Sequence, residues 1–172
     1  GVQTCALPIS AQRLSISHDV SAILATTRRP EDALSTVLER VCTRLGWQLA
    51  MIWRPVEAGH QLAVAELWSQ PDQMPSAFVS ASRATRFAAG EGLPGRVWSQ
   101  GTPVWLPDVT VADNFPRAPQ ARTDGLRGAF AFPIFVGARV WGVVEFFSRH
   151  LEEPNPSLLQ LFAGLGNQIG QY

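Results

Sequence analysis

The stretch GAFAFPIFVGARVWGVVEFFS, residues 128–148, decides the fold class of this chain. It consists of two near-continuous apolar runs that only Val136-Gly137-Ala138 separates. Runs of this length are typical of paired central strands that are covered on both faces. The polar loop DNFPRAPQARTDG (113–125) precedes them, and a loop held over a sheet can cover a small-molecule pocket. The region contains no set of residues typical of a catalyst, so it indicates binding or sensing.

Helical patterns flank these strands. We expect helices over 14–25, over 30–45, where Pro30 begins the helix and Gly46 ends it, and after Asn155, which caps a C-terminal helix. The other segments predict strands at 47–56, 61–69, 83–87, 103–106, 126–135 and 139–148, and short helices at 74–82, 96–100 and within 115–123. This order predicts an α+β fold whose terminal helices share one face of an antiparallel sheet, while the irregular middle region covers the other.

Composition narrows the class of protein. A chain of 172 residues with 46% hydrophobic residues fits one folded domain and excludes disorder. No apolar segment approaches the roughly 20 residues of a membrane helix, so we expect a cytoplasmic domain without membrane insertion. The 14 basic residues, all arginine, balance 14 acidic ones, which argues against nucleic acid as a partner.

Cys5 and Cys42 form neither a CxxC motif nor a Cys/His cluster, which excludes a disulfide framework and a structural zinc site. Cys42 falls among apolar helix positions, where we expect a buried, inert thiol. The N-terminal sequence GVQTCALPIS resembles the translation of a common sequencing adapter. We therefore expect residues 1–10 to be non-native, residues 11–172 to form a single domain, and the C-terminal helix to continue into a downstream domain.

Four motifs are similar to those of the GAF domain family: GEGLPGRVW (90–98), DNFPRA (113–118), GLRGAFAFPI (125–134) and GVVEFFS (142–148). The resemblance extends over about residues 14–172 and is closest to GAF modules of bacterial sensor histidine kinases and related multidomain signalling proteins. It implies a GAF/PAS-like fold with a central antiparallel sheet of about five or six strands. It also implies N- and C-terminal helices on one face and short helices and loops over a small-molecule pocket on the other.

The ligands known for this family are disfavoured here. Cyclic-nucleotide-binding members carry an Asn-Lys/Arg … Phe-x-x-x-Asp-Glu signature, whereas NFP (114–116) is followed by no Asp-Glu pair at that spacing. Covalent bilin attachment uses a cysteine before the GLR-type strand, and residues 114–124 contain none. Haem needs an axial ligand, but we expect His18, His60 and His150 to face solvent or a helix end. Free-methionine sulfoxide reductases of this fold depend on several cysteines. The ligand therefore stays unidentified.

The candidate ligand-binding residues lie in the cover and on the central strands: Trp98, Trp105, Asp108, Asn114, Phe115, Arg117, Arg127, Phe130, Phe132, Glu145 and Phe147. The tryptophans either stack on a flat ligand or simply cover the sheet. An Arg–Asp pair either holds a carboxylate or phosphate or pins the loop internally. Glu145 is costly to bury alone, so it reaches water, pairs with an arginine such as Arg127, or faces a polar pocket. Strand alternation places it on the face of Val143 and Phe147.

We expect a sensory or regulatory domain of a bacterial signal-transduction protein that binds an unidentified small molecule between the sheet and the cover over 98–124. Ligand binding would shift the population of cover conformations, and the terminal helices would pass this shift to a fused output domain such as the histidine kinase of a two-component system. A homodimer seam is expected at Leu158, Phe162, Leu165 and Ile169.

No enzyme activity is predicted, because the sequence shows no nucleophile–base pair and no metal-ligand cluster. Catalytic and metal-binding residues are accordingly not expected. Gly92, Gly95 and Gly101 match no phosphate-loop spacing and indicate a tight turn near the sheet instead. The alternative to a sensor is a ligand-free dimerisation or spacer domain whose pocket is filled by Trp and Phe side chains.

Overall fold

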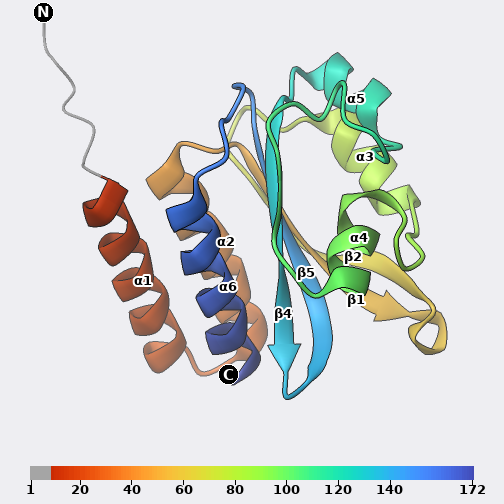
Figure 1. Ribbon diagram of the computed structural model, residues 1–172. Helices are drawn as coiled ribbons and strands as arrows, with labels where there is room; N and C mark the ends of the chain where they lie inside the picture. The colour runs from red at the N-terminus through yellow and green to blue at the C-terminus, as the bar shows by residue number, and fades with distance from the viewer. Residues whose placement is uncertain (1–8) are drawn as a thin grey trace, which may run out of the picture.

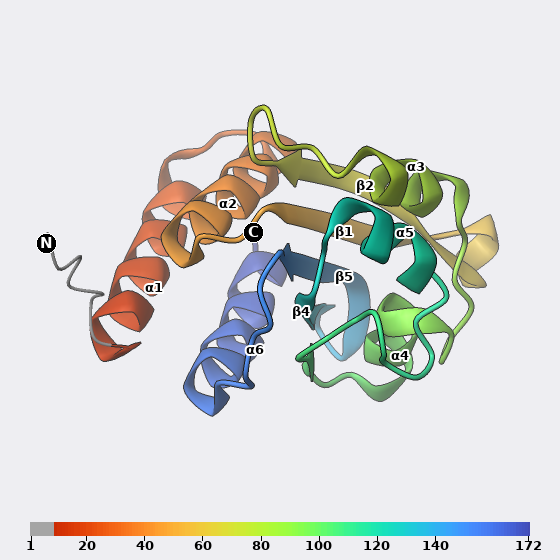
Figure 2. The ribbon, with the colours of Figure 1, turned by 90° about the horizontal axis from the view of Figure 1, so that it is seen from above.

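The two apolar runs form the antiparallel strands β4 (Gly128–Val136) and β5 (Arg139–Ser148) in the computed structural model, which describes residues 9–172. β5 is the middle strand of a five-stranded sheet with the order β2-β1-β5-β4-β3. The other strands are β1 (Leu49–Val56), β2 (Gln61–Ser69) and β3 (Val104–Leu106). Helices and loops cover both faces (Figures 1 and 2), which explains why β4 and β5 are apolar on both sides. The predicted α+β fold is confirmed.

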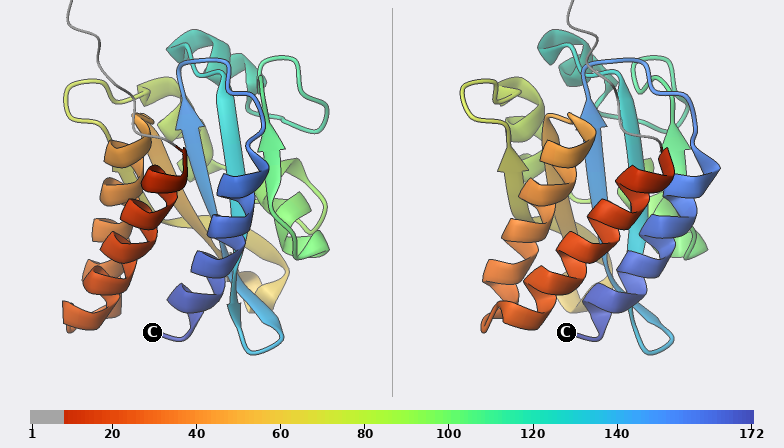
Figure 3. Two further views of the ribbon diagram at one scale, coloured as in Figure 1. Left: turned by 60° about the vertical axis from the view of Figure 1, so that its left-hand side comes forward. Right: turned by 90° about the vertical axis from the view of Figure 1, so that its left-hand side faces the viewer.

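Helices α1 (Ile9–Thr26), α2 (Pro30–Leu45) and α6 (Pro156–Gly170) lie on one face of the sheet. α2 and α6 pack against the strands, and α1 packs against both of these helices (Figure 3). The predicted helix ends are confirmed: Gly46 ends α2 in a left-handed conformation with φ of 69°, and Asn155 Oδ1 accepts a hydrogen bond from the backbone N–H of Leu158 at 3.2 Å.

Short helices α3 (Ser76–Ala84), α4 (Gly92–Gln100) and α5 (Ala118–Asp124) cover the opposite face together with their connecting loops (Figure 2). We call residues 71–127 on this side the cover. A short 3₁₀ helix, Glu57–Gly59, makes the turn between β1 and β2. The predicted strand over 83–87 is wrong, because α3 continues to Ala84 and only an isolated bridge to β2, between Phe87 and Leu62, follows it.

The glycines at the start of α4 allow a close approach of two chain segments. Gly92 has a φ of 63°, and a Cβ on it would meet the ring of Phe87. A Cβ on Gly95 would meet the carbonyl oxygen of Ala88. The predicted close approach is present, but Gly92 and Gly95 belong to α4, so the helix begins earlier than residue 96 and the turn lies before it.

The sheet separates two clusters of buried apolar residues, one on the helix side and one on the cover side. Along β5, Val144 and Phe146 face the helices, whereas Val143 and Phe147 face the cover. Glu145 shares the cover face, as alternation predicts. Of the segment predicted to be non-native, residues 1–8 lie outside the described part of the chain. From residue 9 onwards, no helix combines the length and apolar character needed to cross a membrane.

Candidate ligand-binding site

A buried carboxylate lies at the centre of the cover face. Glu145 is 0% exposed and stands between its strand neighbours Met51 of β1 and Ala131 of β4. The indole Nε1 of Trp53 donates a hydrogen bond to Glu145 Oε2 at 2.6 Å. Because the strand neighbours offer only apolar side chains, a carboxylate here needs further donors or a cation.

Arg117, at the start of α5, supplies this cation. Its side chain is 2% exposed. Nη2 donates to Glu145 Oε1 at 2.6 Å and Nη1 donates to Oε2 at 3.3 Å, so that the guanidinium and the carboxylate form a two-pronged pair. Nη1 also donates to Ser82 Oγ of α3 at 3.0 Å. The ion pair therefore joins the middle strand to two elements of the cover.

Aromatic rings enclose the guanidinium. The Cζ atom of Arg117 lies 4.8–5.6 Å from the ring centroids of five residues, which we call the aromatic cage: Trp53, Phe78, Phe87, Phe115 and Phe147. Ring faces attract cations at such distances, and more strongly where water is excluded. Nε of Arg117 is buried and has no hydrogen-bond partner within residues 9–172. The site is thus a buried, mainly aromatic cluster in which a few polar atoms converge.

Small residues of β4 leave room for the guanidinium. Ala129 and Ala131 both belong to the cover-side cluster, and Ala131 lies directly opposite Glu145 in the ladder. On the other side of the sheet the same strand carries Phe130 and Phe132. β4 therefore places its bulk against the helices and its smallest side chains against the cage.

Hydrogen bonds from side chains hold the cover above the site. Asn114 has a φ of 53°; its Oδ1 accepts from the backbone N–H of Gly92 at 2.8 Å, and its Nδ2 donates to Gly90 O at 2.9 Å. Asp124 Oδ2 accepts from the backbone N–H of Phe78 at 2.7 Å, in the first turn of α3, where the preceding Pro75 offers no side-chain cap. These bonds position the Arg117 loop and one ring of the cage.

The ion pair of Asp108 and Arg127 differs from the Arg117–Glu145 pair because it is partly exposed to solvent. Arg127 Nη2 donates to Asp108 Oδ2 at 2.7 Å, and Thr110 donates to Oδ1 through its N–H and its hydroxyl. The hydrogen bond from Arg127 is the main reason that the pKa of Asp108 falls to about 2; burial opposes it, and the bonds from Thr110 add to it. The side chain of Arg127 is 42% exposed. This pair pins the loop after β3, and the prediction of Arg127 as the partner of Glu145 is wrong.

The structure divides the other candidate residues between the two faces. Phe115 and Phe147 belong to the cage together with Arg117 and Glu145, and Trp98 is half-buried against the cover-side cluster. Trp105, Phe130 and Phe132 lie on the helix side instead, with the indole Nε1 of Trp105 donating to Glu152 O at 2.8 Å. The prediction that these three residues line a site under the cover is therefore wrong. The physical reason is the register, which places Phe130 opposite Phe146 and so on the helix face.

The groups considered for haem or metal binding lie away from the cage. His18, His60 and His150 are exposed. Within residues 9–172, no group of three or more His, Cys, Asp or Glu side chains is arranged to hold a metal ion. Cys42 is buried in the helix-side cluster, and this burial raises the pKa of its thiol, as expected for an inert cysteine.

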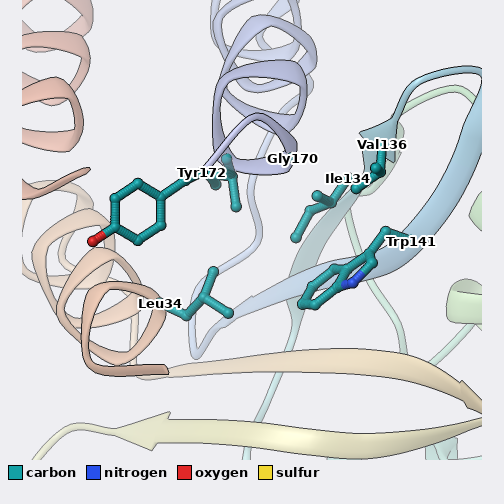
Figure 4. A pocket seen from close by; sticks show the side chains of 7 residues that line it. Leu34, Ile134, Val136, Trp141, Gly170 and Tyr172 are labelled. Carbon is teal, nitrogen blue, oxygen red and sulfur yellow. The ribbon is translucent and has the colours of Figure 1, made fainter. Parts of the chain in front are cut away.

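A cavity of about 220 Å³ lies on the helix side near the end of α6 (Figure 4). The hydroxyl of Tyr172 points away from the strand residues around this cavity. The lining contains no charged side chain and consists of Leu34, Ile134, Val136, Trp141, Ile169, Gly170 and Tyr172. It therefore offers shape and apolar surface, whereas the cage also offers charge and directed hydrogen bonds.

Sequence reasoning missed Trp53, Phe78, Ser82 and Phe87. These residues come from β1, α3 and the segment before α4, none of which carries a polar motif. Only Trp53 carried a usable signal, because an indole N–H in a buried strand needs an acceptor, and Glu145 is the carboxylate of the apolar central run.

Comparison with known proteins gives consistent matches. A family model described as GAF domain matches residues 27–172. Protein NLP1 of Arabidopsis thaliana is 33% identical over 113 residues, covering 56% of the chain and 12% of that protein. Protein NLP2 of Oryza sativa subsp. japonica is 35% identical over 99 residues, covering 51% of the chain and 10% of that protein. Transcription factor GLABRA 3 of A. thaliana is 31% identical over 67 residues, covering 38% of the chain and 10% of that protein. The chain thus spans about a tenth of the length of these relatives.

Solved structures share the fold. The GAF domain of a phosphoenolpyruvate-protein phosphotransferase (ptsP) from Coxiella burnetii superposes with a TM-score of 0.79 at 16% identity, covering 95% of this chain and 94% of that one. The A. aeolicus nlh2 GAF domain in an inactive state superposes with a TM-score of 0.73 at 23% identity, covering 95% of this chain and 96% of that one. Free methionine-R-sulfoxide reductase from Neisseria meningitidis, in complex with its substrate, superposes with a TM-score of 0.76 at 18% identity, covering 94% of this chain and 88% of that one. At these identities the likeness concerns the fold alone.

Proposed function

The chain belongs to the GAF domain family, and on this premise we propose that it is a sensory domain that binds a small molecule between its sheet and residues 98–124. In this proposal it regulates a larger signal-transduction protein and catalyses no reaction itself. The observation that carries the proposal is the Arg117–Glu145 ion pair inside the aromatic cage. Ligand sites are characteristically apolar chambers in which a few polar groups converge.

The ion pair supports recognition because a stable core does not require it. Replacing a buried ion pair by apolar side chains of similar volume is often neutral or stabilising. Glu145 on the middle strand and Arg117 on the cover instead give this chamber a charge and directed hydrogen bonds. Such groups orient a bound molecule and distinguish it from others.

A fused output domain is the second part of the proposal. The chain corresponds to about a tenth of its plant relatives, which supports a regulatory unit within a much longer protein. We propose the histidine kinase of a bacterial two-component system as the output, on the resemblance of the 90–98 and 125–134 motifs to GAF modules of such kinases. A transcription factor is the alternative output, since one plant relative is named as such.

Strand alternation offers a route from the cage to α6. Glu145 faces the cage, and the adjacent Phe146 faces α6, where its ring centroid lies 6.1 Å from that of Phe162. The ring of Phe130, opposite Phe146 on β4, lies 4.5 Å from Phe162. A ligand that changes the position of β5 would therefore change the packing of α6, and through α6 the output domain.

An enzymatic role is the less supported reading of the same fold. The reductase from N. meningitidis has this fold and was captured with its substrate, and the resemblance to the GAF family implies that such reductases depend on several cysteines. Among residues 9–172, the thiol of Cys42 lies on the helix side, across the sheet from Glu145. The cage therefore offers groups for binding a charged molecule and no thiol for reduction chemistry.

One observation favours a second candidate function, that of a ligand-free spacer or dimerisation domain. The guanidinium of Arg117 and the five rings around it themselves fill the space beneath the cover. A chamber filled by the protein's own side chains maintains the fold without any ligand.

We also propose a homodimer through the terminal helices, with a seam different from the predicted one. Four predicted seam residues on α6 are buried in the domain's own core: Leu158, Phe162, Leu165 and Ile169. Leu14 of α1 is 73% exposed and lines a groove together with Leu161 of α6. The outer face of α1 is therefore the seam we propose. Leu14→Asp is expected to convert a dimer to a monomer in light scattering, and an unchanged mass would contradict this seam.

Native mass spectrometry of the purified chain tests the sensor against the spacer. A sensor is expected to retain a small molecule at stoichiometric ratio, and Glu145→Ala should lose it because the cage then lacks its carboxylate. Arg127→Ala is the matched control, since it removes an arginine outside the cage. A chain that carries no additional mass and that no metabolite stabilises in a thermal-shift screen would identify the spacer.

A further inference from the structure

We propose that the aromatic cage is a binding site for a small organic cation with a guanidinium or amidinium group, and that Arg117 occupies this site as an internal ligand until such a cation displaces it. This inference rests on the proposed small-molecule function and names the class of ligand. It follows from which parts of the site belong to the sheet, which belong to the cover, and which hydrogen bonds are made.

The two halves of the ion pair belong to different parts of the fold. Glu145 and Trp53 project from β5 and β1, which are adjacent strands in the middle of the sheet. Arg117 projects from the cover, at the end of a connection over 107–117 that contains neither helix nor strand. If the cover moved, the carboxylate and the indole N–H would therefore stay in place, whereas the guanidinium would move with the cover.

The charge that remains after Arg117 leaves determines the ligand's charge. Glu145 would then be a buried carboxylate with one remaining donor, Trp53 Nε1, and a buried unpaired charge is strongly unfavourable. A cation restores the pairing, and the ring faces of the cage attract it further. A neutral molecule leaves the charge unpaired, and an anion adds repulsion. The site thus selects a cation.

The hydrogen-bond pattern determines the ligand's shape. Arg117 donates to Oε1 and Oε2 of Glu145 from two different nitrogens and to Ser82 Oγ from one of them. This pattern requires a planar fork of two NH₂ groups, which guanidinium and amidinium share and which a single ammonium nitrogen lacks. The ring distances around Arg117 Cζ fit a flat head group of this size.

The third nitrogen of Arg117 indicates how a ligand could bind better than the internal occupant. Nε is buried without a partner within residues 9–172, and a buried donor without a partner is destabilising. An amidinium carries a carbon substituent at the corresponding position and so has no such N–H. We therefore expect an amidinium to bind the cage more tightly than the equivalent guanidinium.

The test uses the full chain and two probes, acetamidinium and methylguanidinium chloride, at constant ionic strength. Arg117→Ala empties the cage of its occupant, so both probes should raise its melting temperature with saturation, acetamidinium at the lower concentration. At ten times the half-saturating concentration the expected rise is about 4 °C. Tetramethylammonium, a cation without N–H donors, should have a weaker effect. Arg127→Ala, which lacks an arginine outside the cage, should show no gain over the wild type.

The wild-type chain provides a second measurement that does not depend on a variant's folding. The indole N–H resonance of Trp53, assigned with Trp53→Phe, should shift on titration with acetamidinium. The half-saturating concentration should be higher than for Arg117→Ala, because the tethered guanidinium competes for Glu145 at an effective concentration of at least millimolar order. Loss of this shift in Glu145→Gln would support the role of the carboxylate.

Two results would overturn the inference. One is a folded Arg117→Ala variant that neither probe stabilises beyond tetramethylammonium. The other is a wild-type Trp53 resonance that stays unchanged at roughly a hundred times the concentration that half-saturates the variant. If the probes fail while native mass spectrometry finds a different bound molecule, the ligand class is refuted and the sensory function stands. If both experiments find nothing bound, the sensory function fails as well.

Discussion

Replacing Arg117 by methionine keeps an unbranched apolar stem in the cage but leaves Glu145 buried without its cation. Of the three hydrogen bonds that Glu145 accepts, only that from Trp53 Nε1 remains. Removing one partner of a buried pair typically costs about 3–5 kcal/mol. For a chain of this size that corresponds to a decrease in melting temperature of about 10 °C.

The reciprocal change, Glu145→Gln, leaves the guanidinium in the cage with neutral acceptors. Hydrogen bonds to charged groups are worth about 1.5–3 kcal/mol, so we expect a loss of that order. In the double variant neither charge is left unpaired, and its free energy of unfolding should exceed the additive expectation by about 3 kcal/mol. Urea unfolding followed by circular dichroism gives all four free energies of the cycle.

The Asp108–Arg127 pair provides the matched control cycle. Its geometry is equally close, with 2.7 Å between Arg127 Nη2 and Asp108 Oδ2, but the side chain of Arg127 is 42% exposed. Solvent screening limits such pairs to about 1 kcal/mol or less. A coupling energy between Arg117 and Glu145 no larger than that of the control pair would refute the description of Glu145 as a buried charge dependent on Arg117.

Three further outcomes are expected. Gly166→Ala should destabilise the chain, because a Cβ there would meet the carbonyl oxygen of Pro133. Gly164→Ala on the same helix should be neutral or stabilising, because a Cβ there meets nothing within 4 Å. The melting temperatures of the two variants in thermal unfolding give the comparison. The pKa of Asp108 lies near 2 in the folded chain, below its unfolded value. The stabilisation that the ionised Asp108 contributes is therefore present above about pH 4 and is lost as the pH falls towards 2. Asp108→Asn should flatten this part of the stability profile, measured by urea unfolding at each pH. The thiol of Cys42 should resist alkylation in the native chain and react in urea, as site-resolved mass spectrometry of the alkylated peptides would show.

The architecture was predictable because strongly patterned segments dominate it. The apolar hairpin, the Gly46 helix end and the Asn155 cap are all local features with a direct structural meaning, and the structure confirms each of them. The predicted strand over 83–87 failed because its hydrogen-bond partners are set by tertiary contacts: only Phe87 reaches β2, and the residues before it complete α3.

The composition of the site was less predictable because it depends on one irregularity in the β4–β5 ladder. The turn pairs Val136 with Arg139, and continuing that register would place Phe130 opposite Glu145. A shift between Ile134 and Phe135 places Ala131 there instead. A one-residue shift exchanges the two faces of a strand. It turns Phe130 and Phe132 to the helices and leaves the space beside Glu145 that Arg117 fills.

The energetic scale of the ion pair fits a domain that changes state when a ligand replaces Arg117. Moving a two-state equilibrium from 1:99 to 99:1 requires a difference in ligand affinity between the states of about 5.5 kcal/mol. Leaving Glu145 buried without Arg117 costs about 3–5 kcal/mol. A cation that pairs with Glu145 removes this cost, and because it does not bury the unpartnered Nε it favours the state in which the cover is open. Because Glu145 lies on the middle strand, with Phe146 against Phe162 on its other face, the exchange takes place beside the packing of α6.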